Sequence, residues 1–425
     1  MDNKIYSEYL KILNDELLLA MGCTEPIAIA YAAALARKTL GIIPEKVEVR
    51  SSANIIKNVK SVVVPNTDGL RGIEAAVAAG TVAGNPEAKL QVLSSIDDSK
   101  IPLIREFLKN AEILSSQSEN PYVFDMHITA FGEGHSAEIE IAGHHTNVIL
   151  IKKDGTVLLK KDYAEQDNSP SADRELLTVE KIVEFADCVK IEDVSELLQR
   201  QIDYNTAIAN EGLRGKWGAN IGNILLNSYG NDVHIRAKAY AAAGSDARMN
   251  GCQLPVVINS GSGNQGLTAS LPVIVYAEEL KSSKEELYRA LVVSNLITIH
   301  MKTGIGRLSA YCGATSAGCG AGAGISYLYG GKFYEIAHTI VNAVAINSGM
   351  ICDGAKASCA AKIASAVEAG LLGMQMQRNG SQFYGGDGII VKGVENTIRN
   401  IGELARKGMC DTDRTIIQLM IPNKK

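Results

Sequence analysis

The spacing of apolar and polar positions changes about 170 residues into the chain. Residues 125 to 159 alternate polar and apolar side chains, with turn signals at residues 132–134 and 154–155. Alternation with a period of two is typical of strands with one buried face, so this segment predicts an antiparallel meander. From about residue 174 onward, almost every segment has the helical period instead.

Shorter patterns predict the remaining elements of the first part. Residues 1–40 read as helix, residues 46–52 and 61–65 as short strands, and residues 72–84 as a helix of small side chains. The polar stretch at residues 160–175 contains Ser169-Pro170 and predicts a boundary. We therefore expect an α+β fold, with a mixed N-terminal part containing antiparallel strands (residues 1–170) and a mostly α-helical C-terminal part (residues 171–425).

Charge and composition narrow the classes of partner. The 425 residues carry a net charge of −5 and no long block of like charge, so neither nucleic acid nor a membrane surface is an expected partner. The first residues show no signal peptide, which favours the cytoplasm. Residues 308–331 carry no charge, but Gly, Ala and Ser dominate them, and this composition favours tight burial over a membrane span.

Cys23 is the first candidate for chemistry. It precedes a helix pattern in which Thr24 is the expected N-cap, Pro26 lies in the first turn and Gly41 ends the helix. A helix N-terminus stabilises a thiolate and can lower a cysteine pKa from about 8.5 to roughly 3.5–7.5. The alternative, an unreactive buried cysteine, fits this stretch equally well.

A glycine-rich loop is the second candidate. An apolar run leads into "SGSGNQG", after which a helix pattern follows. Glycines allow close approach of the backbone, and a helix N-terminus offers N–H groups to an anion such as a carboxylate. The alternative is an ordinary turn. The residues concerned are Ser260, Gly261, Ser262, Gly263, Asn264, Gln265 and Gly266.

Three cysteines form the third candidate. Cys312, Cys352 and Cys359 are spaced 40 and 7 residues apart in uncharged, small-residue surroundings, with a helix break at Asp353-Gly354. Such surroundings suit an iron–sulfur cluster, and three ligands would leave one iron open. The alternative is buried, inert thiols, which we expect for most of the other cysteines, although Cys410 could be a fourth ligand in a resting state.

The histidines give a weaker signal. His127, His135, His144 and His145 fall in the strand-rich part without a zinc spacing, and a strand would point the adjacent pair to opposite faces. We expect His300 to be an ordinary helix histidine with a satisfied side chain.

The segments "GCTEP", "SGSGNQG", "SAYCGA" and "GMICDGAKASC" together resemble the L-cysteine desulfidase family of [4Fe–4S] lyases, which is related to the alpha chain of iron–sulfur L-serine dehydratases. The resemblance covers nearly the whole chain, and the cysteine spacing is its specific part. It implies α,β-elimination of L-cysteine to pyruvate, ammonia and sulfide without pyridoxal phosphate. It also implies that Cys312, Cys352 and Cys359 hold the [4Fe–4S] cluster and that Cys23 is the base. For substrate binding, our own hypothesis names Thr24, Glu25, Ser260, Ser262, Gly263, Asn264 and Gln265.

Other functions stay open at this point. The related dehydratases eliminate water, so an L-serine deaminase is one alternative. A pyridoxal phosphate lyase is another, because "SGNQG" resembles the carboxylate loop of such enzymes and Lys238 precedes it. The third is an iron–sulfur sensor, although it would need an output surface. A homodimer is compatible with the sequence, which does not determine the oligomeric state.

Overall fold

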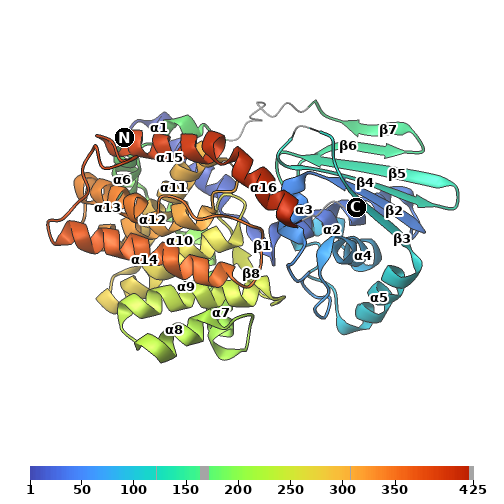
Figure 1. Cartoon of the computed structure of the whole chain (residues 1–425), viewed down its shortest axis with the longest axis horizontal. Helices are drawn as coiled ribbons and strands as arrows, with labels where there is room; N and C mark the ends of the chain where they lie inside the picture. Colours follow the sequence, from blue (N-terminus) through green and yellow to red (C-terminus); the bar gives the residue numbers. More distant parts are fainter. Residues whose placement is uncertain (121, 163–171, 307, 421–425) are drawn as a thin grey trace.

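The computed structural model describes residues 1–120, 122–162, 172–306 and 308–420. Helices gather at one end of the molecule and a twisted sheet with its covering helices at the other (Figure 1). The fold is α+β, as the sequence predicts.

The sheet has six strands in the order β3-β2-β4-β5-β6-β7. β4 to β7 form the predicted antiparallel meander, and its turns at Glu133-Gly134 and Asp154-Gly155 have positive φ at both residues. Among the described strands, only β2 and β3 pair in parallel. The sequence pattern did not predict strand β3, because nearly all of its side chains are exposed and they do not alternate between core and solvent. The strands are β2 (Lys46–Ser51), β3 (Glu112–Gln117), β4 (Asp125–Gly132), β5 (His135–Ala142), β6 (Val148–Lys153) and β7 (Thr156–Lys160).

Two predictions for the N-terminal residues are wrong. Residues 1–40 are not one helix, because strand β1 (Leu19–Met21) separates α1 (Asn3–Glu16) from α2 (Thr24–Leu40) and pairs with β8 (Pro255–Val257). Residues 61–65 form no strand beyond a single bridge from Val63 to Arg71, because α3 (Ala53–Val59) precedes them and the chain turns directly after them. The small-residue helix is confirmed as α4 (Gly72–Ala83), and α5 (Ile101–Asn110) leads into β3.

Helix α12 (Gly313–Leu328) runs through the middle of the helical part and is buried along most of its length. It packs against α13 (Phe333–Ile346), and the uncharged segment of residues 308–331 is mostly buried, as expected. None of the described helices is long and apolar enough to cross a membrane. The other helices of this part are α6 (Val179–Cys188), α7 (Ile191–Arg214), α8 (Ile221–Tyr229), α9 (Val233–Met249), α10 (Gly263–Leu280), α11 (Lys284–Ile305), α14 (Cys359–Arg378), α15 (Val394–Glu403) and α16 (Cys410–Met420).

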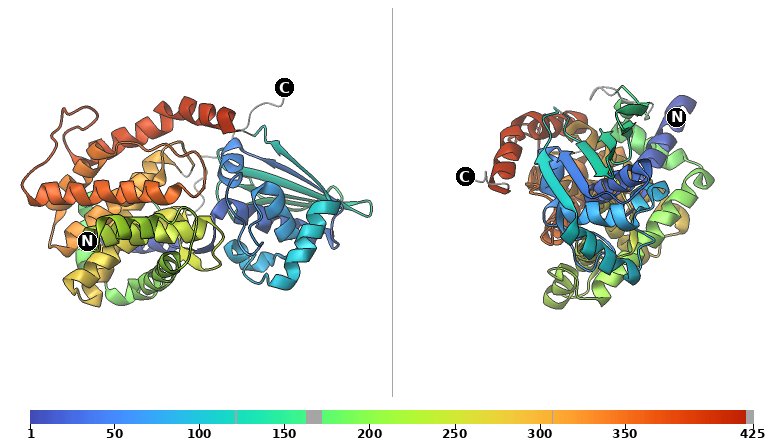
Figure 2. Two further views of the ribbon diagram at one scale, coloured as in Figure 1. Left: turned by 60° about the horizontal axis from the view of Figure 1, so that its bottom comes forward. Right: turned by 90° about the vertical axis from the view of Figure 1, so that its right-hand side faces the viewer.

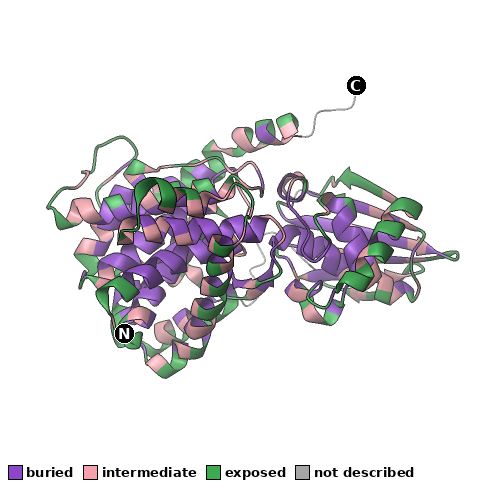
Figure 3. Cartoon of the chain, turned by 90° about the horizontal axis from the view of Figure 1, so that it is seen from below, coloured by how far each residue is buried: buried purple, intermediate pink, exposed green. Residues whose placement is uncertain are grey.

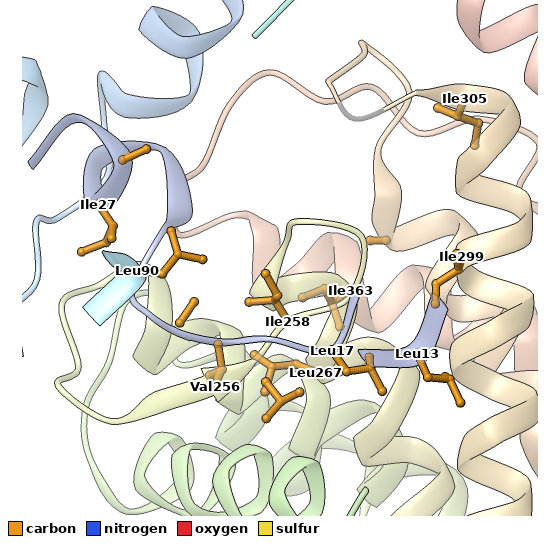
Figure 4. Packing of buried hydrophobic residues seen from close by; sticks show 14 of the residues in the cluster. Leu13, Leu17, Ile27, Leu90, Val256, Ile258, Leu267, Ile299, Ile305 and Ile363 are labelled. Carbon is orange, nitrogen blue, oxygen red and sulfur yellow. The ribbon is translucent and has the colours of Figure 1, made fainter. Parts of the chain in front are cut away.

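The chain passes between the two ends of the molecule several times. Helix α1 packs on the helical part, where the Tyr9 hydroxyl donates to the Leu176 carbonyl oxygen (2.9 Å), and α16 reaches back to α3 (Figures 1 and 2). Both ends contain buried residues (Figure 3). Apolar side chains such as Leu17, Ile258 and Leu267 lie close together in the core (Figure 4). The boundary expected near residue 170 falls on residues 163–171, outside the described residues, and stays a prediction.

Candidate active site

A cavity of about 110 Å³ lies where the helical part meets α2, α3 and the sheet turns. Its size suits a small molecule. Most of the residues that the sequence singled out line it together: Cys23, Glu25, Ser260, Ser262, Asn264, Gln265, Cys312, Cys352 and Cys359. Thr24 and Gly263 do not line it. The Thr24 hydroxyl lies 3.0 Å from the Gly261 carbonyl oxygen and so ties α2 to the loop, whereas Gly263 packs behind the cavity wall.

Four helices begin at this cavity. Cys23 is the N-cap of α2, Ser262 of α10 and Cys312 of α12, and Cys359 is the first residue of α14. A helix N-terminus carries about half a positive charge from unpaired N–H groups. Four such ends around one small cavity favour bound anions.

The three cysteines of the predicted cluster come from two neighbouring loops. Residues 310–312 pair with residues 350–352 through a bridge between Tyr311 and Ile351, in which the Cys312 N–H donates to the Met350 carbonyl oxygen (2.8 Å). Cys359 follows after the turn at Gly354. The cysteines that the chain separates by 40 residues therefore lie side by side.

Charge at this cavity favours sulfur ligands. The Cys312 thiol donates a hydrogen bond to Cys352, and together with Lys57 and Lys302 this lowers the pKa of Cys352 to about 6 despite burial. Lys362 also lines the cavity. Three cationic side chains can offset the negative charge of thiolates and inorganic sulfide.

The donor set is compatible with an iron–sulfur cluster. Among the described residues, no group of three or more His, Cys, Asp or Glu side chains is placed to hold one metal ion. In a [4Fe–4S] cluster each cysteine binds a different iron, so the three sulfur atoms need not converge on one point. Soft thiolates at helix N-termini, with lysines nearby, are compatible with that cofactor.

Cys23 differs from the sequence expectation in two respects. The cysteine, not Thr24, occupies the N-cap position of α2. Its pKa lies well above the ordinary value, because burial and then the adjacent Glu25 carboxylate outweigh the helix end and Arg248. The thiol therefore keeps its proton and donates a hydrogen bond to Glu25 Oε2 (3.1 Å).

Glu25 carries the negative charge of this pair. Burial alone would raise the pKa of Glu25, but His145, the hydrogen bond from Cys23 and Arg248 together bring the pKa below its ordinary value. Asn58 Nδ2 donates to the second carboxylate oxygen (3.0 Å) and fixes its orientation. Cys23 and Glu25 thus form a hydrogen-bonded thiol–carboxylate pair at the cavity wall.

The glycine-rich loop is shorter than expected. Asn259 and Ser262 pair across a tight turn in which Ser260 (φ 50°) and Gly261 (φ 81°) are both left-handed. Helix α10 starts at Gly263, so Asn264 and Gln265 lie in its first turn and not in a loop. The Gln265 Oε1 atom is buried and has no hydrogen-bond partner among the described residues, which leaves it available to a ligand.

Several cavity residues were not predicted from the sequence. His145 was considered only as a strand residue, whereas it lies in the turn between β5 and β6, with its ring edge-on to Phe124 at 4.7 Å. Arg248 and Lys302 could have been found from the sequence, because each is a charged residue within a helix of mostly small or apolar side chains. The unpredicted lining residues are Lys57, Asn58, Phe124, His145, Arg248, Lys302, Leu308, Ser309, Tyr311, Gly313, Ala314, Gly354, Ala355, Lys362 and Ile363, with Gly261 known only as part of the loop.

Three residues considered earlier lie outside the cavity lining. Lys238, the candidate Schiff-base lysine, does not line the cavity and pairs with Glu368 at 2.5 Å. His300 bonds to Glu395 (2.7 Å) and is satisfied, as expected. Cys410 is exposed at the start of α16, where its thiol donates to the Arg406 carbonyl oxygen.

Comparison with known proteins gives the class first. The model of the serine dehydratase alpha chain matches residues 87–418, and the chain belongs to this family. The class is therefore a lyase of the serine dehydratase type, and iron–sulfur enzymes of this type are associated with a [4Fe–4S] cluster.

Full-length relatives agree with this assignment. The chain is 59% identical over 419 residues to a "UPF0597 protein" of Desulfitobacterium hafniense, covering 99% of this chain and 97% of the relative. It is 48% identical to a "UPF0597 protein" of Lachnoclostridium phytofermentans, covering 98% and 100%. These names specify no substrate.

Proposed function

We propose that this protein is an iron–sulfur-dependent lyase that removes sulfide from L-cysteine by α,β-elimination. The substrate loses its Cα proton and its thiol group, and the resulting aminoacrylate takes up one water to give pyruvate and ammonia. The observation that carries the proposal is the position of the Cys23–Glu25 pair in the same small cavity as Cys312, Cys352 and Cys359.

The cysteine triad is assigned to the cofactor. A [4Fe–4S] cluster held by Cys312, Cys352 and Cys359 would supply an open iron that acts as a Lewis acid on the leaving group. Lys57, Lys302 and Lys362 stabilise the negative charge that accumulates at this wall.

The proton acceptor is Cys23 acting with Glu25. The Cys23 thiol donates a hydrogen bond to Glu25 Oε2, and transfer of this proton to the carboxylate would leave a thiolate that can accept the Cα proton. Burial of both side chains keeps bulk water away from the acceptor. The substrate carboxylate lies at the N-terminus of α10, where free N–H groups and the Asn264 and Gln265 side chains can donate to it.

L-Serine is the second candidate substrate, because the family match is to a serine dehydratase chain. The same residues would remove the Cα proton, and hydroxide would replace the thiol as leaving group. A soft iron–sulfur site favours the softer sulfur atom, which is our reason for placing L-cysteine first.

A direct assay distinguishes these substrates. The protein is purified without oxygen, iron and acid-labile sulfide are counted per chain, and pyruvate and sulfide are measured with L-cysteine and L-serine. We expect equimolar pyruvate and sulfide from L-cysteine, slower pyruvate release from L-serine, and loss of both after the iron is removed. Pyruvate from L-serine alone would reassign the protein to the dehydratases. A cluster-loaded sample inactive with both substrates would reject the lyase proposal.

A further inference from the structure

Arg248 is a buried cation with an incomplete set of partners. It lies in the last turn of α9, is 2% exposed and lines the cavity. Its only hydrogen bond to a described residue runs from Nη1 to Asn264 Oδ1 (3.0 Å). Its buried Nε has no partner there, and no described carboxylate forms an ion pair with it. A buried guanidinium is costly to keep without an anion.

The surroundings of Arg248 increase this cost. The guanidinium crosses the first residue of α10, where a Cβ on Gly263 would lie 2.2 Å from Arg248 Nε and 2.7 Å from Cζ. The chain therefore needs a glycine there to let the arginine pass. The guanidinium and the N-terminus of α10 are both positive, since this helix end presents unpaired N–H groups. The Glu25 carboxylate interacts with Arg248 electrostatically but forms no ion pair with it, so an anion in contact with both positive groups is favoured.

We infer that Arg248 binds the α-carboxylate of the amino-acid substrate, together with the first N–H groups of α10. Asn264 holds the guanidinium through its Oδ1 atom, which leaves its amide Nδ2 group free to donate to the same carboxylate. Arginine can bind a carboxylate through two parallel hydrogen bonds and so orients it as well as neutralising it.

This inference rests on the proposed function and narrows the substrate class. The carboxylate is the anionic group that L-cysteine and L-serine share, whereas amines such as cysteamine lack it. Arg248 would therefore select α-amino acids over amines, while the part of the same cavity lined by the cluster cysteines acts on the side-chain leaving group.

Binding of unreactive ligands tests the inference without elimination. L-Alanine has the carboxylate but no leaving group, and L-alaninamide lacks the carboxylate. Titration calorimetry and thermal unfolding without oxygen should show that the cluster-loaded wild-type protein binds L-alanine and not L-alaninamide. Arg248→Met should bind L-alanine about ten- to a hundredfold more weakly, which corresponds to one charge-assisted hydrogen bond. The affinity of Arg248→Lys for L-alanine should lie between those of the wild-type protein and Arg248→Met. This second variant also tests the inference if Arg248→Met does not fold.

A control on the same helix separates ligand binding from charge loss. Arg236 pairs with Glu279 at the surface of α9, so Arg236→Gln should bind L-alanine like the wild-type protein. Equal affinity for L-alanine in a folded, iron-containing Arg248→Met or Arg248→Lys sample would overturn the inference, as would wild-type protein that binds L-alanine no better than its amide. If binding depends on Arg248 but neither L-cysteine nor L-serine is converted, the carboxylate site stands and the lyase proposal fails.

Discussion

At Cys23 the local sequence and the tertiary surroundings act on the thiol in opposite directions. The start of α2 favours a thiolate, whereas burial against Val62 and Met249 and the adjacent Glu25 raise the pKa of Cys23. The resting side chain is a thiol, and its reactivity depends on the carboxylate that accepts its proton. A single residue thus acquires its chemistry from a partner two positions away.

Substitution of Cys23 and of the cluster cysteines should have different effects on iron content and activity. Cys23→Ala should keep iron and acid-labile sulfide near the wild-type level and lower pyruvate formation from L-cysteine by about 10²–10⁴-fold, because only the proton acceptor is lost. Alanine at Cys312, Cys352 or Cys359 should remove iron, colour and activity together, since one of three ligands is missing. Both sets are measured on protein purified without oxygen.

Cys188→Ala is the matched control, because Cys188 is exposed and far from the cavity lining, and it should retain iron and activity. Loss of the cluster in Cys23→Ala would make Cys23 a ligand. Full activity in that variant would place the base elsewhere.

Close packing between two helices brings the ligand cysteines together. A Cβ on Gly318 of α12 would lie 2.1 Å from the Ala366 carbonyl oxygen of α14, and one on Gly322 would lie 2.5 Å from the Gly370 carbonyl oxygen. From the first contact to the second, the residue number rises by four on both helices, so the two helices run parallel. Their first turns, with Cys312 and Cys359, therefore lie at the same end.

Gly318→Ala should push these helices apart. We expect a loss of about 1–3 kcal/mol in the free energy of unfolding, which is typical of overpacking, and a lower iron content because Cys312 and Cys359 move relative to each other. Denaturant unfolding and iron analysis measure the two effects. Gly304→Ala in α11 is the control, because its Cβ would lie 3.3 Å from the Gly402 Cα and needs only a small shift. Equal effects of both substitutions would show that the contact between α12 and α14 at Gly318 has no particular role in positioning the ligand cysteines.

One buried ion pair joins the two ends of the chain. Lys57 of α3 is 1% exposed and pairs with Asp413 of α16 at 2.5 Å, although 356 residues separate them. Lys57 also lines the cavity, and its backbone packs against Gly354 of the ligand loop. The C-terminal helix thereby supports the wall of the site from the far side.

Asp413→Ala should destabilise the protein by about 3 kcal/mol or more, because it leaves the Lys57 charge buried without a partner. Lys57→Met combined with Asp413→Ala should recover much of this loss, and denaturant unfolding measures both variants. The exposed pair of Lys407 and Glu403 is the control, where Glu403→Ala should cost less than about 1 kcal/mol. A double variant as unstable as Asp413→Ala would show that the pair itself, and not the unpaired charge, matters.

The amino-acid sequence by itself determined the features that depend on local spacing. Alternation and helical period are properties of neighbouring residues, so the meander from β4 to β7, the helix α4 and the mostly helical second part were predictable. The segments around Cys23, Asn264 and Cys312 were recognisable for the same reason, because each is a short local pattern. The strand β3 was missed because its side chains are exposed, and residues 61–65 were predicted wrongly as a strand because the chain turns there.

The tertiary structure alone decided which groups meet at the cavity. Arg248, Lys57 and His145 come from α9, α3 and a sheet turn, and no local spacing links them. The proton on Cys23 also depends on burial, which long-range packing creates. Contacts between distant segments set the local dielectric and the charge partners, and these control acid–base and anion-binding chemistry more strongly than residue type does.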